Sequence, residues 1–379
     1  MPEPDLLVNL RKELHKFPEL SGQEKMTSLR LSNFLHDLAP DDLITNIGGN
    51  GLAAIFRGAG NGPRIMIRAE LDALPIEESN DFEYRSVHPG VAHKCGHDGH
   101  MAIAAGVAHR FSDRRPDHGE VIVLFQPSEE NGKGAFEVIN DPVFKSIEPD
   151  YVMALHNLPG YERHEIVLRQ GVFAAASEGM IIRLKGRTAH AGEPQNGISP
   201  TTAISQILAG LPGLAKSNDF NDFILVTIIH ARIGEIAFGT SPGEAVVMAT
   251  LRAYDEKDME ELREKAAGLV KDIAFSENLE VSVEWTEKFP ATANDSFLVS
   301  LAGDTANRLG LRVRHIENAF KWSEDFGWFT RSYRGILFGA GSGKGHPELH
   351  NPDYDFPDEI IDTGVDMIYG MCTELFKKK

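Results

Sequence analysis

Residues 119–130, "GEVIVLFQPSEE", combine an apolar run with a polar segment directly after it. The run is short, continuous and rich in β-branched residues, which is typical of a strand buried on both faces of a sheet. A second segment, 150–160 "DYVMALHNLPG", has the same form, with His156 and Asn157 at its polar end. Apolar strands that alternate with helical segments predict a largely parallel α/β sheet, in which ligands bind beyond the carboxyl ends of the strands.

The α/β pattern is interrupted between residues 178 and 290. Here the predicted elements follow the order β-α-β-β-α-β, which is the ferredoxin-like plan. After about residue 290 the alternation returns, with a strand at "RGILFGAG" and a final helix at "DEIIDTGVDMIYGMCTELF". We therefore expect an α/β domain with a mostly parallel mixed sheet, formed by residues 1–177 and 291–379, and an inserted α+β domain over 178–290.

The composition favours some classes of protein and disfavours others. Acidic residues exceed basic ones and give a formal net charge of −18, so no basic surface is available to neutralise nucleic acid or an anionic membrane. Neither a secretory signal nor an apolar run long enough to span a membrane is visible. The chain has only two cysteines, Cys95 and Cys372, which do not form a disulfide framework. We expect a cytoplasmic protein with reduced thiols.

The segment 93–100, "HKCGHDGH", is the first candidate for metal binding. Cys95 and His97 lie two residues apart in a glycine-containing turn before a buried helix, and thiolate and imidazole are ligands for transition metals. The absence of a second nearby cysteine excludes a four-cysteine or two-cysteine structural zinc site and a redox pair. A helix-capping turn with a buried thiol is the alternative interpretation.

Further acidic and histidine side chains follow the apolar strands. Glu129 and Glu130 come directly after the first strand, and their side chains diverge, so one can hold a metal while the other acts as a general base. His156 lies at the end of the second strand, and His350 lies in a loop near the end of the chain. Together with the cysteine–histidine turn, these residues suffice for two metal ions that share a bridging ligand.

Seven motifs occur in this order along nearly the whole chain: "RAELDALP", "HKCGHDGH", "FQPSEE", "ALHNLP", "GRTAHAGEPQNG", "SEDF" and "LHNPDYDF". As a set they resemble the amidohydrolase branch of the dinuclear aminoacylase/carboxypeptidase metallopeptidases. That branch includes hippurate hydrolases, indole-acetyl-amino-acid hydrolases, N-acyl-amino-acid amidohydrolases and N-acetyldiaminopimelate deacetylases. The resemblance implies a catalytic domain of zinc-peptidase topology, interrupted by a lid or dimerisation domain.

The resemblance also implies roles for individual residues. Cys95 matches the bridging metal ligand, and the remaining ligands match His97, Glu130, His156 and His350. Glu129 matches the general base, and His190 matches a lid histidine that stabilises the oxyanion, often in the partner subunit's site. Two weaker candidates for substrate binding are Arg252, as a carboxylate ligand, and Asp72, which also resembles an acid that steadies the metal site. Glu70 and Ser199 depart from the aspartates common at their positions.

The implied reaction is hydrolysis of the amide bond of an N-acyl amino acid by a metal-bound water, which yields a carboxylic acid and a free amino acid. The implied cofactors are two divalent transition-metal ions, zinc or manganese first and cobalt or nickel next, because a cysteine ligand argues against magnesium. The implied partner is a second copy of the chain, joined through the inserted domain. The alternatives are a dinuclear carboxypeptidase or dipeptidase and, since Glu129 and His190 are both present, less readily a non-catalytic metal-binding relative.

Overall fold

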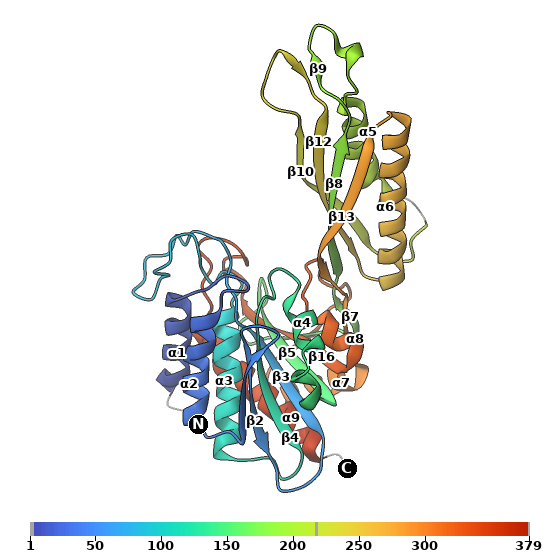
Figure 1. Ribbon diagram of the computed structural model, residues 1–379. Helices are drawn as coiled ribbons and strands as arrows, with labels where there is room; N and C mark the ends of the chain where they lie inside the picture. The colour runs from blue at the N-terminus through green and yellow to red at the C-terminus, as the bar shows by residue number, and fades with distance from the viewer. Residues whose placement is uncertain (1–3, 217–218, 378–379) are drawn as a thin grey trace. The chain divides into compact units, whose positions relative to one another are not determined.

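The computed structural model describes residues 4–216 and 219–377, and the chain divides into two compact units (Figure 1). Unit 1 contains the residues up to Phe173, the segment Thr292–Ala319 and the residues from Glu324 onward. Unit 2 contains Ala174–Ala291 and the short segment Phe320–Ser323. The predicted boundaries after residues 177 and 290 lie close to these, but the short segment was not anticipated.

Unit 1 is built on a mixed sheet of eight strands in the order β1-β2-β4-β3-β5-β16-β6-β15. Its four central strands, β4, β3, β5 and β16, are parallel to one another, and antiparallel pairs flank them. The strands are β1 (Asp42–Ile47), β2 (Gly51–Arg57), β3 (Arg64–Glu70), β4 (Glu120–Gln126), β5 (Tyr151–Pro159), β6 (Ile166–Leu168), β15 (Val313–His315) and β16 (Arg334–Gly343). The parallel centre puts the carboxyl ends of β3, β4 and β5 at one edge of the sheet.

Helix α1 (Pro4–Lys16) of unit 1 buries one apolar stripe, whereas α3 is buried on all sides over residues 97–108. In α1, the buried leucines Leu7, Leu10 and Leu14 recur at helical spacing, and each contributes roughly 1.5–3 kcal/mol by leaving water. The other helices are α2 (Lys25–Asp37), α3 (His97–Asp113), α4 (Gly134–Asn140), α7 (Ser296–Arg308), α8 (Gly327–Ser332) and α9 (Ile361–Lys377). Short strands β7 (Gly171–Ala174) and β14 (Thr292–Asn294) pair with each other.

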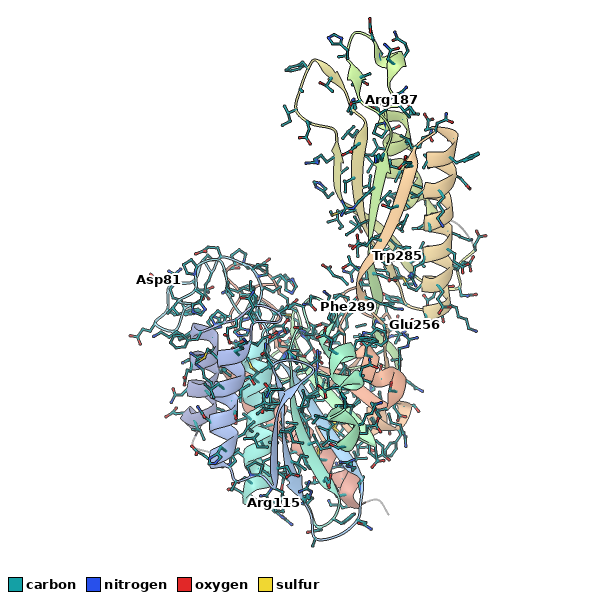
Figure 2. All side chains as sticks on the ribbon, viewed as in Figure 1. Asp81, Arg115, Arg187, Glu256, Trp285 and Phe289 are labelled. Carbon is teal, nitrogen blue, oxygen red and sulfur yellow. The ribbon has the colours of Figure 1, made fainter. Side chains whose placement is uncertain are left out.

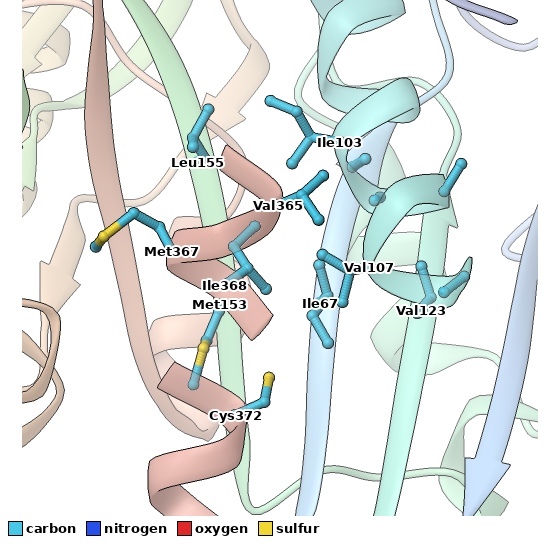
Figure 3. Packing of buried hydrophobic residues seen from close by; sticks show 14 of the residues in the cluster. Ile67, Ile103, Val107, Val123, Met153, Leu155, Val365, Met367, Ile368 and Cys372 are labelled. Carbon is cyan, nitrogen blue, oxygen red and sulfur yellow. The ribbon is translucent and has the colours of Figure 1, made fainter. Parts of the chain in front are cut away.

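Helices α3 and α9 approach each other closely because each carries a glycine at the contact. A Cβ atom at Gly106 would lie 2.5 Å from Val365, and one at Gly364 would lie 2.6 Å from Ile103. Figure 3 shows the side chains of these two helices in one buried cluster with residues of the sheet. The labelled members are Ile67, Ile103, Val107, Val123, Met153, Leu155, Val365, Met367, Ile368 and Cys372. This packing holds α3, and with it the turn that carries Cys95 and His97, against the sheet.

The two edges of the unit 1 sheet differ in the loops that they carry. Asp81 lies on the long connection from β3 to α3, at the carboxyl edge, and Arg115 lies at the opposite edge, where the chain enters β4 (Figure 2). The long connection is anchored by the buried Lys94, whose Nζ donates to Glu78 Oε1 at 2.6 Å and to the carbonyl oxygen of Tyr354 at 2.7 Å. The residue that follows Lys94 is the candidate ligand Cys95.

Unit 2 is a four-stranded antiparallel sheet with two helices. The strand order β10-β12-β8-β13 is the order expected for a ferredoxin-like β-α-β-β-α-β chain. Its elements are β8 (Ala176–Lys185), α5 (Thr201–Leu214), β10 (Ile224–Ile233), β12 (Glu244–Ala253), α6 (Glu256–Ser276) and β13 (Glu280–Phe289). Asp255 caps α6 by accepting from the backbone N–H groups of Lys257 and Asp258. Trp285 of β13 lies under the Arg263 guanidinium of α6, 4.7 Å from ring centroid to Cζ (Figure 2).

These two units confirm the predicted fold class, an α/β domain with a mixed sheet and an inserted ferredoxin-like α+β domain. Over residues 4–216 and 219–377, no helix has both the length and the apolar character that crossing a membrane requires.

Candidate functional site

The turn before α3 places Cys95 and His97 at the carboxyl edge of the unit 1 sheet. Gly96, between them, has a left-handed φ of 98°, and a Cβ atom there would lie 2.5 Å from Asn157 Oδ1. Only glycine meets both demands without strain. Because of this turn, His97 becomes the first residue of α3 while Cys95 stays outside the helix, and both side chains are buried.

The five predicted ligands and the predicted base converge at this edge. Three overlapping sets have ligand atoms within 4.8 Å of one another: Cys95, His97 and His156; Cys95, Glu130 and His350; and His97, Glu129 and Glu130. The members come from the start of α3, from β5 and from the segments after β4 and β16. Cys95, His97 and Glu130 each belong to two of these sets, so the sets form one continuous cluster.

Two of the candidate ligands, His97 and His156, are oriented by hydrogen bonds at their Nδ1 atoms. Nδ1 of His97 lies 2.8 Å from the carbonyl oxygen of Asp72, and Nδ1 of His156 lies 2.8 Å from that of Asn157. A carbonyl oxygen only accepts, so each Nδ1 carries the proton and each Nε2 faces the cluster. Nε2 of His156 lies 3.7 Å from Sγ of Cys95. Burial lowers the pKa of His156 to about 3, which keeps its ring neutral.

His350 differs from the other candidates because it is exposed. Its backbone has a left-handed φ of 67°, a strained conformation for a residue other than glycine. The backbone N–H of His350 donates to the carbonyl oxygen of Lys94 at 2.7 Å, which ties the loop after β16 to the turn that carries Cys95.

Asp72 holds the two adjacent glutamates. Its carboxylate accepts from the backbone N–H of Glu129 at 3.1 Å and from that of Glu130 at 3.0 Å. Oδ2 of Asp72 also accepts from Ser21 Oγ at 2.7 Å, and the side chain is fully buried. Both oxygens are therefore used inside the protein. These contacts agree with the expectation that Asp72 steadies the site, and its role in substrate binding stays a prediction.

The pKa values of the cluster reflect an excess of buried negative charge. Burial raises the pKa of Glu129 well above its ordinary value and the pKa of Glu130 to about 7. Burial also raises the pKa of the Cys95 thiol. Burial opposes the charging of His97, but carboxylates led by Glu70 raise its pKa to about 9. Each shift has the direction expected where several anionic groups lack a cation.

The donor set fits metal ions. Within the described part of the chain, Nε2 of His97 is buried without a hydrogen-bond partner. It lies 3.8 Å from a carboxylate oxygen of Glu129 and 3.8 Å from one of Glu130, too far for hydrogen bonds. Ligand–metal distances near 2 Å put the ligands of one ion roughly 3–4 Å apart. Thiolate, imidazole and carboxylate at this spacing form a transition-metal site.

The other two predicted site residues belong to unit 2. His190 lies in β9 (Ala189–His190), which pairs with β11 (Thr240–Ser241); the His190 side chain is exposed, and its Nδ1 accepts from the backbone N–H of Gly192 at 3.1 Å. Arg252 lies in β12, and its Nη1 donates to the carbonyl oxygen of Lys321 at 2.9 Å and to Ser323 Oγ at 2.8 Å. Burial lowers the pKa of Arg252. These contacts show that Arg252 is not an unconstrained surface arginine.

A second buried layer was not predicted from the sequence. His100 Nδ1 lies 2.7 Å from Glu70 Oε2, and His100 Nε2 lies 2.6 Å from Asn157 Oδ1. Glu24 Oε1 accepts from the backbone N–H of Ser128 at 2.9 Å, next to Glu129. The signal for Glu70 was available, since a carboxylate in a buried strand needs a partner. Glu24 lies before an exposed helical segment and carries no such signal.

Comparison with known proteins identifies relatives over almost the whole chain. The model of peptidase family M20/M25/M40 matches residues 66–374. An N-acetylcysteine deacetylase of Bacillus subtilis is 30% identical over 94% of this chain and 93% of its own length. A hippurate hydrolase of Campylobacter jejuni is 28% identical over 93% of this chain and 92% of its own length. Among solved structures, the Bacillus subtilis YXEP protein, a dinuclear metal binding peptidase from the M20 family, aligns with a TM-score of 0.84, 26% identity and 99% coverage of both chains.

Proposed function

The chain belongs to peptidase family M20/M25/M40, and we propose that it is a metal-dependent amidohydrolase that cleaves the amide bond of N-acyl amino acids. The observation that carries this function is the buried cluster in which Glu130 shares ligand-forming sets with Cys95, His97 and His350 while Glu129 lies beside it. A pure metal-storage or structural site needs ligands only. A second buried carboxylate beside the ligands is what a hydrolase needs for proton transfer.

The metal ligands in this proposal are Cys95, His97, Glu130, His156 and His350, with Cys95 shared by two divalent ions. When bound, such ions polarise a carbonyl oxygen and lower the pKa of water toward neutrality. Zinc and manganese are the first candidates and cobalt and nickel the next, because thiolate and imidazole together disfavour magnesium. The relative of known structure that binds two metals supports the number of ions.

The chain's own residues supply proton transfer and charge stabilisation. Glu129 accepts a proton from the water that attacks the amide carbon and then delivers that proton to the leaving nitrogen. His190 donates a hydrogen bond to the oxygen that becomes negative during attack, as donors of an oxyanion hole do. The C–N bond breaks, and the products are one carboxylic acid and one free amino acid.

The substrate class follows from the named relatives and from the chemistry of the second unit. Relatives that act on N-acetylcysteine and hippurate both hydrolyse a small acyl group from an amino acid. We assign Arg252 to the α-carboxylate of the substrate, because a guanidinium fork recognises a carboxylate. The rival function is cleavage of short peptides, in which the acyl group is itself an amino acid.

A substrate panel tests the function directly. Metal-free protein is reconstituted separately with zinc, manganese, cobalt and nickel, and each form is assayed with N-acetyl amino acids, N-benzoyl amino acids and dipeptides. We expect turnover of N-acyl amino acids with at least one metal and weak turnover of dipeptides. Fast dipeptide cleavage without N-acyl turnover would establish the peptidase function instead, and two bound metals without any turnover would indicate a binding protein.

We include a homodimer joined through unit 2 and a cytoplasmic location in the proposal. β10 is an edge strand of its sheet, and Ile229 in it is 60% exposed. The loop that follows exposes Ile236 and Phe238 completely. An exposed apolar edge strand is a surface for pairing with a second copy. A reducing compartment agrees with the two unpaired cysteines, Cys95 and Cys372.

A further inference from the structure

The segment "SEDF", residues 323–326, is one of the family motifs and contains two adjacent acidic residues. In the structure, Glu324 is 2% exposed and Asp325 is fully buried. Both carboxylates face Arg68, an arginine of β3 that is itself buried. Arg68 Nη2 donates to Glu324 Oε1 at 2.8 Å and to Asp325 Oδ1 at 2.6 Å. Arg68 also contacts Glu70, so one guanidinium serves three buried carboxylates.

Asp325 is fixed by more than this ion pair. Its Oδ2 accepts from the backbone N–H of Ala135 and from Gln126 Nε2, each at 2.8 Å. Arg68 Nε donates in turn to Gln126 Oε1 at 2.8 Å. Asp325 therefore joins β3, the last residue of β4 and the first turn of α4. Each of these contacts is buried, and charge-assisted hydrogen bonds of this kind hold a narrow geometry.

The backbone of Asp325 touches the assigned general base. Its N–H donates to Glu129 Oε1 at 3.4 Å, and this carboxylate lies three residues after the end of β4. The other carboxylate oxygen of Glu129 lies 3.8 Å from His97 Nε2. The position of the 325 N–H group thus sets the orientation of the Glu129 carboxylate on the side away from the ligand cluster. Anchoring the Asp325 side chain fixes that N–H group.

We propose that Arg68 and Asp325 are positioning residues that orient the carboxylate of Glu129 for proton transfer. This inference rests on the proposed function, in which Glu129 is the general base. Arg68 acts on Glu129 indirectly, through residues 324 and 325. It balances the charge of Glu324 and Asp325 and keeps this segment against β3 and β4. Neither residue touches substrate or holds a metal.

Two substitutions at one position separate anchoring from folding. Asp325→Ala removes every acceptor of the side chain, whereas Asp325→Asn keeps the shape and one acceptor oxygen. A misplacement of about 1 Å in a catalytic group can cost about 100-fold. We expect Asp325→Ala to lower kcat about 10- to 100-fold, with KM within about twofold and two metals still bound. Asp325→Asn should lose less, because one oxygen still accepts while its NH2 group faces a donor.

A second measurement tests how firmly residues 324–327 are held in place, and it needs neither metal nor substrate. In the metal-free chain, hydrogen exchange of a peptide that covers residues 324–327 should be faster in Asp325→Ala than in wild type, and intermediate in Asp325→Asn. Arg314→Met is the matched control, because Arg314 also pairs with a buried carboxylate of unit 1, Glu165, at 3.1 Å. This control should change neither kcat nor exchange at 324–327.

The outcomes distinguish failure of the proposed function from failure of the positioning role of Arg68 and Asp325. If the wild-type protein cleaves nothing in the panel, the proposed function fails, and the exchange measurement still tests the anchoring. Equal losses of kcat in Asp325→Ala and Asp325→Asn would show that charge and not anchoring matters, and would overturn the inference. A loss of bound metal that parallels the loss of kcat would also overturn it. Should Asp325→Ala fail to fold, Arg68→Lys replaces it: kcat should fall about tenfold with metals and KM retained, and an unchanged kcat would contradict the proposal.

Discussion

Adjacent residues in a chain can have different functions when their side chains diverge and their backbone N–H groups are both held by hydrogen bonds. Glu129 and Glu130 are in this situation, since Asp72 accepts from both of their N–H groups. The preceding residue, Ser128, has a left-handed φ of 56°, which a side chain other than glycine adopts only where the surroundings impose it. Glu24 supplies part of that constraint by accepting from the N–H of Ser128.

The two glutamates should therefore fail in different ways. Glu129→Gln should keep two metals per chain and lose about 10²–10⁴-fold in kcat, because the base is gone and the ligands remain. Glu130→Gln should lose metal first, because an amide is a poorer ligand than a carboxylate. Metal content and kcat are measured on the same preparations, with the exposed Glu83→Gln as control. A Glu129→Gln rate within threefold of wild type would remove Glu129 from the mechanism.

We assign Cys95 as the bridging ligand, since it shares one ligand-forming set with His97 and His156 and another with Glu130 and His350, so its loss should affect both metals. Cys95→Ser should lower the metal content below two per chain after mild reconstitution, and most activity should be lost with it. The matched control is Cys372→Ala, which removes the other cysteine from the core beneath α9 and should leave metal binding unchanged. Full occupancy and full rate in Cys95→Ser would show that the bridging assignment is wrong.

The convergence of candidate residues in space could be predicted where polar side chains follow an apolar strand. Glu129 and Glu130 end one such run and His156 lies in another, and a parallel sheet brings the ends of its strands together. Arg68 and Asp325 could not be paired in this way, because 257 positions separate them and neither ends a strand of its own. An arginine inside a buried strand does signal that it has a buried acidic partner, but not which one.

At the scale of elements, α1 is attached to the site by charges as well as by its leucines. His15, near its end, is fully buried between two carboxylates, with Nδ1 2.9 Å from Asp98 Oδ2 and Nε2 2.9 Å from Glu78 Oε1. Asp355 lies 3.9 Å from Nδ1, and the His93 ring centroid lies 6.4 Å away. Burial opposes protonation, but the bonds to Asp98 and Glu78 raise the pKa of His15 to about 9.

This arrangement predicts a pH-dependent stability. The folded pKa of His15 lies above the unfolded value near 6.5, so its contribution is fully present below pH 6.5 and is lost as the pH rises through 9. The contribution is about 3 kcal/mol at most. Urea unfolding of wild type and His15→Gln should differ more at pH 6 than at pH 9.5. His36→Gln, whose histidine side chain is 82% exposed, is the control. A difference that does not change with pH would exclude a charged His15.

Elements were predictable in proportion to their length and periodicity. The apolar runs within 119–130 and 150–160 and the predicted helix over 358–376 have clear patterns and appear as β4, β5 and α9. β6 and β15 have three residues each, too few for a pattern, and they form only because they pair with each other and with β16. The antiparallel β1–β2 pair was also missed, since its first strand is largely exposed.

At the scale of the whole molecule, the change from α/β alternation to β-α-β-β-α-β order revealed an inserted domain. That signal works because each plan needs its own spacing of strands and helices. The same signal could not show that residues 320–323 return to unit 2, because a four-residue excursion has no pattern of its own. Arg252 explains the excursion physically, since it donates to Lys321 and Ser323 within that segment.

The last prediction concerns two copies of the chain. His190 lies in unit 2 and the ligand cluster lies in unit 1, and we expect His190 to complete the site of the partner subunit in a twofold dimer. His190→Ala and Glu129→Ala should each be inactive alone. In a mixed dimer, the chain with intact Glu129 receives His190 from its partner, so one site is whole, while the other site lacks both groups.

Random exchange of equal amounts makes about half of the dimers mixed, so activity should recover to roughly one quarter of wild type. The two variants must be co-expressed, or unfolded and refolded together, because subunits that never separate cannot exchange. Mass spectrometry of the intact dimers verifies that mixed species form, and His36→Ala, at an exposed histidine of α2, serves in place of His190→Ala as the control that should not need rescue. If verified mixed dimers are as inactive as their parents, His190 acts within its own chain or has no part in the reaction.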